Sequence, residues 1–370
     1  MSAPSSPETE TGAEPAGGSR TLGALRRSYS LIQALGVLVL LVVVMQIANE
    51  RFLTPTNISN LLGQMTIMLI VAAGMTVIMI SGEFDVAVGA VVGLSAAVAG
   101  WLLVRWMPVP TAADQATWVI LVGVLVPLMI GPAIGIFAGL IVTKAHIPSF
   151  IVTLGTLMMA RSLTLVVTQG QPIPDIPEPI RAFGQGRLVN LPLPLDFSGF
   201  FGSGAIADLF VWLPIQNIVW VAVLVYAIGW FLLERTTFGK RVYAVGSNRT
   251  VALLSGIRAD RIKIYCFMIV GFTASLAGVV SVSRLGAVSP NTGEGLEFEV
   301  IAAVVIGGTS LSGGQGRILR TIIGVIIIAL TRNFLNLARI EVFWQGFATG
   351  TIILAAVLLE ALQRRISGRQ

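Results

Sequence analysis

The sequence ERTTFGKRVYAVGSNRTVALLSGIRADRIK, from Glu234 to Lys263, is the most charged internal stretch of an otherwise apolar chain. It contains seven lysines and arginines but only two acidic residues. The runs on either side, Val211–Leu233 and Ile264–Ser283, are long enough to cross the hydrocarbon core of a bilayer. Because basic loops between membrane helices stay on the cytoplasmic side, this stretch predicts a membrane protein with a cytoplasmic loop here.

The composition of the whole chain agrees with that prediction. Of the 370 residues, 55% are hydrophobic and 11% are charged, whereas soluble domains carry about 25% charged residues. The formal charge of +6 comes from basic residues in loops between apolar runs, which argues against nucleic-acid binding. One cysteine and one histidine argue against a disulfide framework and against a metal site. We therefore expect an all-α integral membrane protein.

Ten apolar runs predict ten transmembrane helices. In chain order they are Leu31–Ala48, Leu61–Ile80, Val86–Val104, Trp118–Val142, Ile147–Thr168, Val211–Leu233, Ile264–Ser283, Leu296–Ile306, Ile318–Leu337 and Phe343–Leu362. The eighth run is short for a hydrocarbon core of ~30 Å, so we expect it to begin earlier, to follow an irregular path or to be half a helix. Ten spans place most lysines and arginines on the cytoplasmic side when both termini are cytoplasmic.

The regions outside these spans complete the domain organisation. Residues 1–28 begin with a stretch rich in Pro, Ser, Gly, Thr and Glu, which predicts a disordered cytoplasmic tail. Residues 29–365 are expected to form one multipass domain. The longest loop, residues 169–210, is rich in Pro and Gly and falls on the outer side. It is either a docking surface for a partner protein or a solvated connector.

The junction between the second and third spans, ISGEFDVAVG at residues 80–89, holds two carboxylates, Glu83 and Asp85. Charge at a membrane boundary is costly and often functional. One alternative is that an exposed cytoplasmic turn tolerates both carboxylates. Another, which we favour for Asp85, is that its side chain caps the helix that follows.

Arg161 lies inside the fifth predicted span. An arginine at that depth costs about 2.5–3.5 kcal/mol unless it is paired or faces water. We therefore expect Arg161 to face the bundle interior or a polar cavity, which Thr153, Thr156, Ser162 and Thr164 are placed to line. The alternative is that its side chain reaches toward an interface.

Residues 311–315, LSGGQ, match the signature of ABC ATPase domains. Such a domain also needs a P-loop, G-x-x-x-x-G-K-[ST], directly after a strand. The one Gly-Lys pair in the chain, Gly239-Lys240, is followed by arginine and lacks the earlier glycine. We therefore predict a tight glycine-rich connection between the eighth and ninth spans. Its candidate residues are Gly307, Gly308, Ser310, Gly313 and Gly314.

Within the opening stretch, residues 250–257 (TVALLSGI) form a short amphipathic run with room for a few helical turns. The stretch is much longer than a turn needs, and its glycines favour a compact element over a loose linker. The alternative is a solvated loop whose arginines only fix the topology. We expect a docking element for a soluble partner.

With these motifs the chain resembles the ribose, xylose and arabinose permeases of bacterial ABC sugar importers. The resemblance covers nearly everything after the amino-terminal tail and rests on residues 81–100, 147–173, 236–257 and 300–317. The A-x-G-x-N core of the family's cytoplasmic coupling element matches Ala244, Gly246 and Asn248. The candidate ATPase-coupling residues are these three together with Ala252, Leu254 and Gly256. The family pattern I-D-[LV]-S-V-G matches residues 84–89 except at Phe84 and Ala87.

The resemblance implies an ABC importer permease fold of about ten helices in the bacterial inner membrane. It implies a second permease subunit, with a homodimer expected, a periplasmic solute-binding protein, and cytoplasmic ATPase subunits that bind ATP and Mg. This chain would then hold no cofactor and no catalytic residue. The expected cargo is a monosaccharide or related polyol. The alternatives are branched-chain amino acids, nucleosides or another small polar solute, or a secondary transporter, which would need ionisable groups deep in several spans.

Overall fold

The computed structural model describes residue 36, residues 38–106, 113–186 and 215–341, and a few single positions up to residue 358. The predicted tail, part of the first span, the second half of the long loop and most of the tenth span lie outside these residues. The chain divides into two compact units, Met1–Ala48 and Asn49–Gln370. The first contributes a short apolar helix, Leu38–Ala48, and the second contains every other described element.

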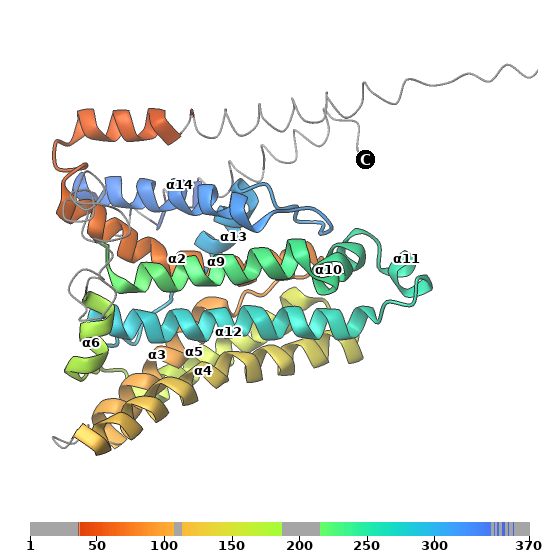
Figure 1. Ribbon diagram of the computed structural model, residues 1–370, viewed down its shortest axis with the longest axis horizontal. Coiled ribbons are helices and arrows are strands. Elements are labelled where there is room, and N and C mark those ends of the chain that lie inside the picture. The colour runs from red at the N-terminus through yellow and green to blue at the C-terminus, as the bar shows by residue number, and fades with distance from the viewer. Residues whose placement is uncertain are drawn as a thin grey trace, which may run out of the picture. The chain divides into compact units, whose positions relative to one another are not determined.

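The described part of the second unit is helical (Figure 1). Its elements are α2 (Pro55–Ile80), α3 (Val88–Gly100) with a π-helical continuation, η1 (Trp101–Trp106), α4 (Ala113–Lys144), α5 (Ser149–Thr168), α6 (Glu178–Gln185), α9 (Asn217–Arg235), α10 (Thr237–Ser247), α11 (Arg249–Leu254), α12 (Ala259–Leu285), α13 (Leu296–Ile306) and α14 (Ile318–Leu337). Among the described residues, seven helices are long and apolar enough to cross a membrane. The all-α membrane class is confirmed.

The predicted spans and the observed helices differ mainly where a helix begins with polar residues. α2 begins at Pro55 and not at Leu61, because Thr54 accepts a hydrogen bond from the Asn57 amide and Pro55 fits the first helical position. α12 begins at Ala259 and not at Ile264, with charged residues in its first turns. Hydropathy alone does not detect such turns.

The eighth predicted span is half a helix. α13 has eleven residues and is therefore about 16 Å long, half of a ~30 Å hydrocarbon core. An irregular segment, Gly286–Gly295, leads into it, and its N-cap residue Gly295 has φ +76°. The alternative that this span begins earlier as a helix is wrong.

α12 is the central helix and packs against α2, α3 and α4 (Figure 1). Small residues allow close approach, and a Cβ on Gly131 of α4 would collide with the backbone of Gly271 on α12. Pro132 lacks the amide that would bond to the Leu128 carbonyl, and the Ser275 hydroxyl of α12 donates to that carbonyl at 2.9 Å. The sequence therefore supplies a side-chain partner where a proline removes a backbone one.

The two ends of the helix bundle carry different elements (Figure 1). α10 and α11 lie at one end, and α6 lies at the opposite end, where the Asn217 amide donates to the Gly186 carbonyl at 2.9 Å. The described part of the long loop is packed, because Ile173 exchanges backbone bonds with Val288 and is fully buried. Most other described residues of the loop are exposed, so whether the loop is a docking surface or a connector stays a prediction.

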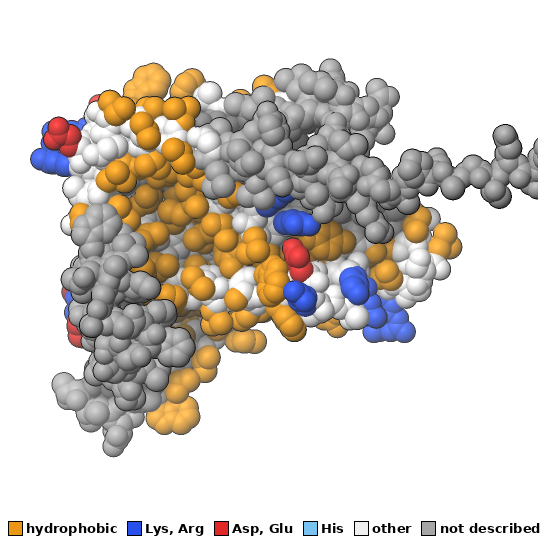
Figure 2. All heavy atoms as spheres, turned by 45° about the horizontal axis from the view of Figure 1, so that its top comes forward, with side chains coloured by type: hydrophobic (Ala, Val, Ile, Leu, Met, Phe, Trp, Pro, Cys, Tyr) orange, Lys and Arg blue, Asp and Glu red, His pale blue; other side chains and the backbone are white. Residues whose placement is uncertain are grey.

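The described surface between the two ends is largely apolar, as expected of a membrane protein. Figure 2 shows apolar side chains over much of one face, with the charged side chains toward its two ends. On α5, for example, the side chains of Phe150, Met158 and Val166 are exposed. These side chains have no covering element within the described chain, so they are placed to meet lipid or another subunit.

Candidate coupling site

The predicted coupling stretch folds into two short helices joined by one capping residue. The Thr236 hydroxyl accepts the Gly239 amide and starts α10. Asn248 ends α10 in an extended conformation, and its Oδ1 accepts the Val251 amide at 3.1 Å, which starts α11. The asparagine of the A-x-G-x-N core is therefore the N-cap of α11.

The carboxyl-terminal end of α10 lies directly against the backbone of two other segments. A Cβ on Gly246 would collide with the Ile80 carbonyl at the end of α2 and would lie 2.7 Å from the Gly314 nitrogen. The Gly314 amide itself donates to the Ile80 carbonyl at 2.8 Å. A Cβ on Gly313 would lie 2.7 Å from Gly82 Cα. We call Gly82, Gly246, Gly313 and Gly314 the glycine junction.

The LSGGQ-like segment belongs to this junction. Gly313 and Gly314 have φ +80° and +71°, values that favour glycine, and they form the turn between α13 and α14. The Ser310 amide closes the turn by donating to the Gln315 carbonyl at 2.9 Å. At its start, Gly307 packs against the backbone of α14 and Gly308 takes φ +86°. The glycines of this segment therefore serve backbone geometry.

A tyrosine adds a side-chain contact from α10 to the same connection. The Tyr243 hydroxyl donates to the Gly316 carbonyl at 2.9 Å. Burial raises the pKa of Tyr243, and the charge of Glu234 raises it further while Arg317 lowers it. The phenol therefore stays protonated and remains a donor at physiological pH. Ala244, the first residue of the A-x-G-x-N core, packs against the main apolar core beside it.

α11 differs from α10 in that it exposes apolar side chains. Leu254 is 85% exposed, and Val251 and Leu253 are also exposed, while Ala252 is buried. Gly256, with φ +78°, turns the chain from α11 into α12. Apolar side chains exposed beside the aqueous phase on such a short helix are typical of an interaction surface.

Both carboxylates of the turn between α2 and α3 are buried. Glu83 forms an ion pair with Lys263 of α12, and the Phe84 amide donates to the Ser149 hydroxyl at 3.2 Å. Asp85 is 4% exposed. The alternative of an exposed turn that tolerates two carboxylates is therefore wrong.

Asp85 closes a turn just before α3. Its Oδ1 accepts the Ala87 amide at 2.8 Å, whereas the N-cap of α3 is Ala87 and no side chain bonds to the first amides of the helix. The capping prediction is therefore wrong in its position. Burial raises the pKa of Asp85 to about 6, and the hydrogen bond from Ala87 opposes that rise.

Arg161 bonds to the irregular segment that precedes α13. Its Nη1 donates to the Thr292 carbonyl at 3.2 Å. Thr153 and Thr156 are buried, and their hydroxyls donate to carbonyls one turn back, those of Ser149 and Val152. Their hydrogen bonds are thus satisfied within α5, and a role in lining the transport path stays a prediction.

Three further ionisable residues, which the sequence pattern did not single out, lie in the apolar helices α13 and α14. Glu297 is buried in the first turn of α13, and Arg332 of α14 binds both carboxylate oxygens of Glu299 at 2.9 Å. Arg161 is therefore one of several such groups. Two glutamates in an eleven-residue apolar run were the available signal. Within the residues that the structure describes, no cluster of three metal-ligating side chains occurs.

Comparison with known proteins identifies the family. Residues 57–357 match the family described as "Branched-chain amino acid transport system / permease component". The ribose import permease protein of Bacillus subtilis (strain 168) is 39% identical over 325 residues, which cover 87% of this chain and 90% of that protein.

Two further relatives cover similar lengths. The xylose transport system permease protein of Escherichia coli (strain K12) is 32% identical over 86% of this chain and 88% of its own. The autoinducer 2 import system permease protein of Photorhabdus luminescens is 30% identical over 90% of each chain. No solved structure gives a significant match. From the family match over most of the chain and the apolar helices, the chain belongs to this family of ABC importer permease components.

Proposed function

We propose that this chain is the membrane permease subunit of an ATP-driven importer for a monosaccharide or related polyol in a bacterial inner membrane. The observation that carries the proposal is the 39% identity to a ribose import permease over 87% of the chain. The family description names branched-chain amino acids, but the relatives above import ribose, xylose or autoinducer 2. A sugar is therefore the cargo that these similarities favour.

The geometry supports a division of work between α10 and α11. The exposed apolar residues of α11 would bind a cytoplasmic ATPase subunit, which alone would hold ATP and Mg. α10 would pass the movement through the glycine junction to the end of α2 and to the connection before α14. Such a device works as a two-state element that the partner biases by differential contact. The path would form between this chain and a second copy, and a solute-binding protein would dock at the α6 end.

Reconstituted transport tests the cargo. The permease and its ATPase are placed in proteoliposomes with the solute-binding protein, and uptake of ribose, xylose and leucine is measured with and without ATP. We expect ATP-dependent uptake of at least one sugar and none of leucine. Leucine uptake would contradict the sugar assignment, and uptake without the ATPase would contradict the ATP-driven mechanism.

Two substitutions in the coupling stretch test the docking role of α11. Leu254→Glu places a charge on its most exposed apolar residue, and Gly256→Pro is incompatible with φ +78°. Because Leu254 touches little of this chain, membrane insertion and thermal midpoint of Leu254→Glu should not change. We expect substrate-stimulated ATPase activity to fall at least about tenfold, as for loss of an interface hot spot. Leu254→Met is the matched control, and normal stimulation in both test variants would refute the docking role.

A further inference from the structure

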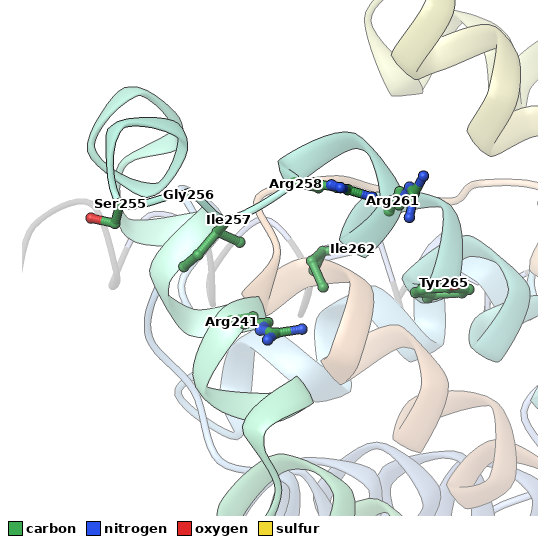
Figure 3. A pocket seen from close by; sticks show the side chains of 8 residues that line it. All are labelled: Arg241, Ser255, Gly256, Ile257, Arg258, Arg261, Ile262 and Tyr265. Carbon is green, nitrogen blue, oxygen red and sulfur yellow. The ribbon is translucent and has the colours of Figure 1, made fainter.

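A basic groove lies between α10 and the start of α12 (Figure 3). Arg261 and Tyr265, four residues apart, lie on one side of α12, and Arg258 is the N-cap residue directly before the helix. Arg241 of α10 forms the facing wall (Figure 3). The groove has a volume of about 410 Å³. We use the term basic groove for these four residues and the space between them.

The charge of the groove is not neutralised within the described chain. Among the described residues, no hydrogen bond or ion pair involves the guanidinium groups of Arg241, Arg258 and Arg261. Two acidic residues near this end of α12 are already engaged, and Glu234, at the end of α9, has no ion pair among the described residues. Asp260 binds Arg249 at 3.0 Å, and Glu83 binds Lys263. Three unpaired arginines therefore line one groove, Arg258 and Arg261 on one side and Arg241 on the other (Figure 3), which fits an anionic ligand.

The side of α12 that carries the groove changes character along its length. After the arginines comes Tyr265, which is 47% exposed. Its ring lies edge-on to that of Phe238, with 6.4 Å between the ring centroids. Seven residues further along, Phe272 is exposed as well. Tyrosine is enriched at the level of lipid head groups, and an exposed phenylalanine further along a membrane helix is placed to meet acyl chains or another subunit. The sequence of basic, aromatic and apolar residues matches the head group, glycerol and acyl regions of a phospholipid.

We propose that the basic groove binds the phosphate head group of an anionic phospholipid from the leaflet on the α10 side. The guanidinium groups would bind the phosphodiester oxygens, Tyr265 would lie at the glycerol, and one acyl chain would follow α12 past Phe272. An acidic peptide of a partner protein would use the arginines but would have no use for the apolar continuation into the membrane. This lipid site is independent of which solute the protein carries.

The test measures lipid binding by the purified permease alone. The permease is placed in nanodiscs of phosphatidylcholine with increasing phosphatidylglycerol, and the retained phosphatidylglycerol is quantified by native mass spectrometry after release. The test variant is Arg241→Gln/Arg258→Gln/Arg261→Gln. The control, Lys144→Gln/Lys240→Gln/Arg317→Gln, removes three exposed charges that lie outside the groove but on the same predicted side of the membrane. We expect the test variant to lose affinity for phosphatidylglycerol at least tenfold and the control to change less than twofold.

Further arms of the experiment distinguish a lipid site from misfolding, from a site for free anions and from a protein interface. A variant with lysine at the same three positions keeps the charge and should retain phosphatidylglycerol within about threefold, which excludes misfolding as the cause of a loss. Equal losses in the test and control variants would show a diffuse surface effect and overturn the proposal. Displacement of the lipid by millimolar inorganic phosphate would indicate a site for free anions. Loss of ATPase binding with unchanged lipid retention would assign the groove to the protein partner.

Discussion

α10 and α11 are neighbours in one basic stretch, yet they relate to the rest of the molecule in opposite ways. α10 buries Val242 and Val245 and meets two other segments through the backbone of Gly246. α11 buries only Ala252 and exposes Leu254. α11 therefore has few contacts within the described chain, whereas α10 is held both by buried side chains and by backbone contacts. We therefore predict that substitutions in α10 alter stability and transport together. Substitutions in α11 should alter only the coupling between ATPase activity and transport.

The largest effect is expected at Gly246 of α10, where an added side chain would collide with backbone atoms. Gly246→Ala would force the end of α10 away from Ile80 and Gly314, because the atoms that the new methyl group meets belong to the backbone and cannot rotate away. We expect a cost of about 3 kcal/mol, at the upper end of the range for overpacking, and transport below a tenth of the normal rate. Thermal midpoints in detergent and uptake into proteoliposomes measure the two effects.

Gly155→Ala is the matched control for this substitution. Gly155 lies in α5, and a Cβ there has no atom within 4 Å. Its midpoint should stay the same or rise slightly, since alanine favours helix. If Gly246→Ala were as harmless as this control, α10 would not be fixed as the structure indicates.

The next effect is expected at the buried ion pair between Glu83 and Lys263. Glu83→Gln leaves the Lys263 ammonium without its carboxylate partner. The side chains of Glu83 and Lys263 are 11% and 15% exposed, so the pair is not fully buried. Removing one partner of a fully buried pair costs 3–5 kcal/mol, so we expect about 2 kcal/mol for this partly exposed one. The double variant Glu83→Gln/Lys263→Met should recover much of the thermal midpoint that the single variant loses. A double variant as unstable as the single one would mean that the charge pair is not the cause.

Asp85, in the same turn, predicts a pH dependence. Because its folded pKa is raised to about 6, the folded protein holds the proton more tightly than the unfolded chain. The contribution of Asp85 to stability should therefore be largest below about pH 4 and fall as the pH rises to about 6, by about 3 kcal/mol. Asp85→Asn keeps an acceptor for the Ala87 amide and removes the charge.

Thermal midpoints of the wild type and Asp85→Asn between pH 4 and 8 measure this dependence. The wild-type curve should fall over that interval relative to the variant, and the variant should be the more stable protein at pH 7. Parallel curves would show that Asp85 does not titrate in this range.

The smallest effect is expected on the side of α11. The ion pair between Arg249 and Asp260 is exposed at both partners, 42% and 44%, and such pairs contribute about 0–1 kcal/mol. Arg249→Gln should shift the midpoint by no more than about one degree. A loss comparable to that of Glu83→Gln would show that α11 is held as firmly as α10 and would remove the distinction between the two helices.

Much of the fold could be predicted because membrane helices are encoded locally. The limits predicted for α13 and α14 are those observed. The first turns of α2 and α12 were missed because they carry polar residues that a hydropathy pattern excludes. α10 was missed for a similar reason, since its apolar residues are few and widely spaced.

The site was less predictable because its contacts join distant parts of the chain. The sequence shows that Gly246 and Gly313 are glycines, but their proximity depends on how three helices end at one place. The partner of Glu83 is 180 residues away, so the turn looked solvated when its pairing was unknown. The short helix α11 was predictable, because its amphipathic run is local, whereas the A-x-G-x-N match around Asn248 came from the family resemblance and its coupling role stays a prediction.

The shortness of α13 has a consequence for how the protein is made. Eleven residues cannot cross a bilayer alone, so the insertion machinery has no complete span to recognise between α12 and α14. α13 packs against α2 and α14, so we expect it to take its place only once those helices are in the membrane. This step belongs to biogenesis, and a defect in it would appear as rapid degradation of newly made chains while the mature protein kept its full turnover.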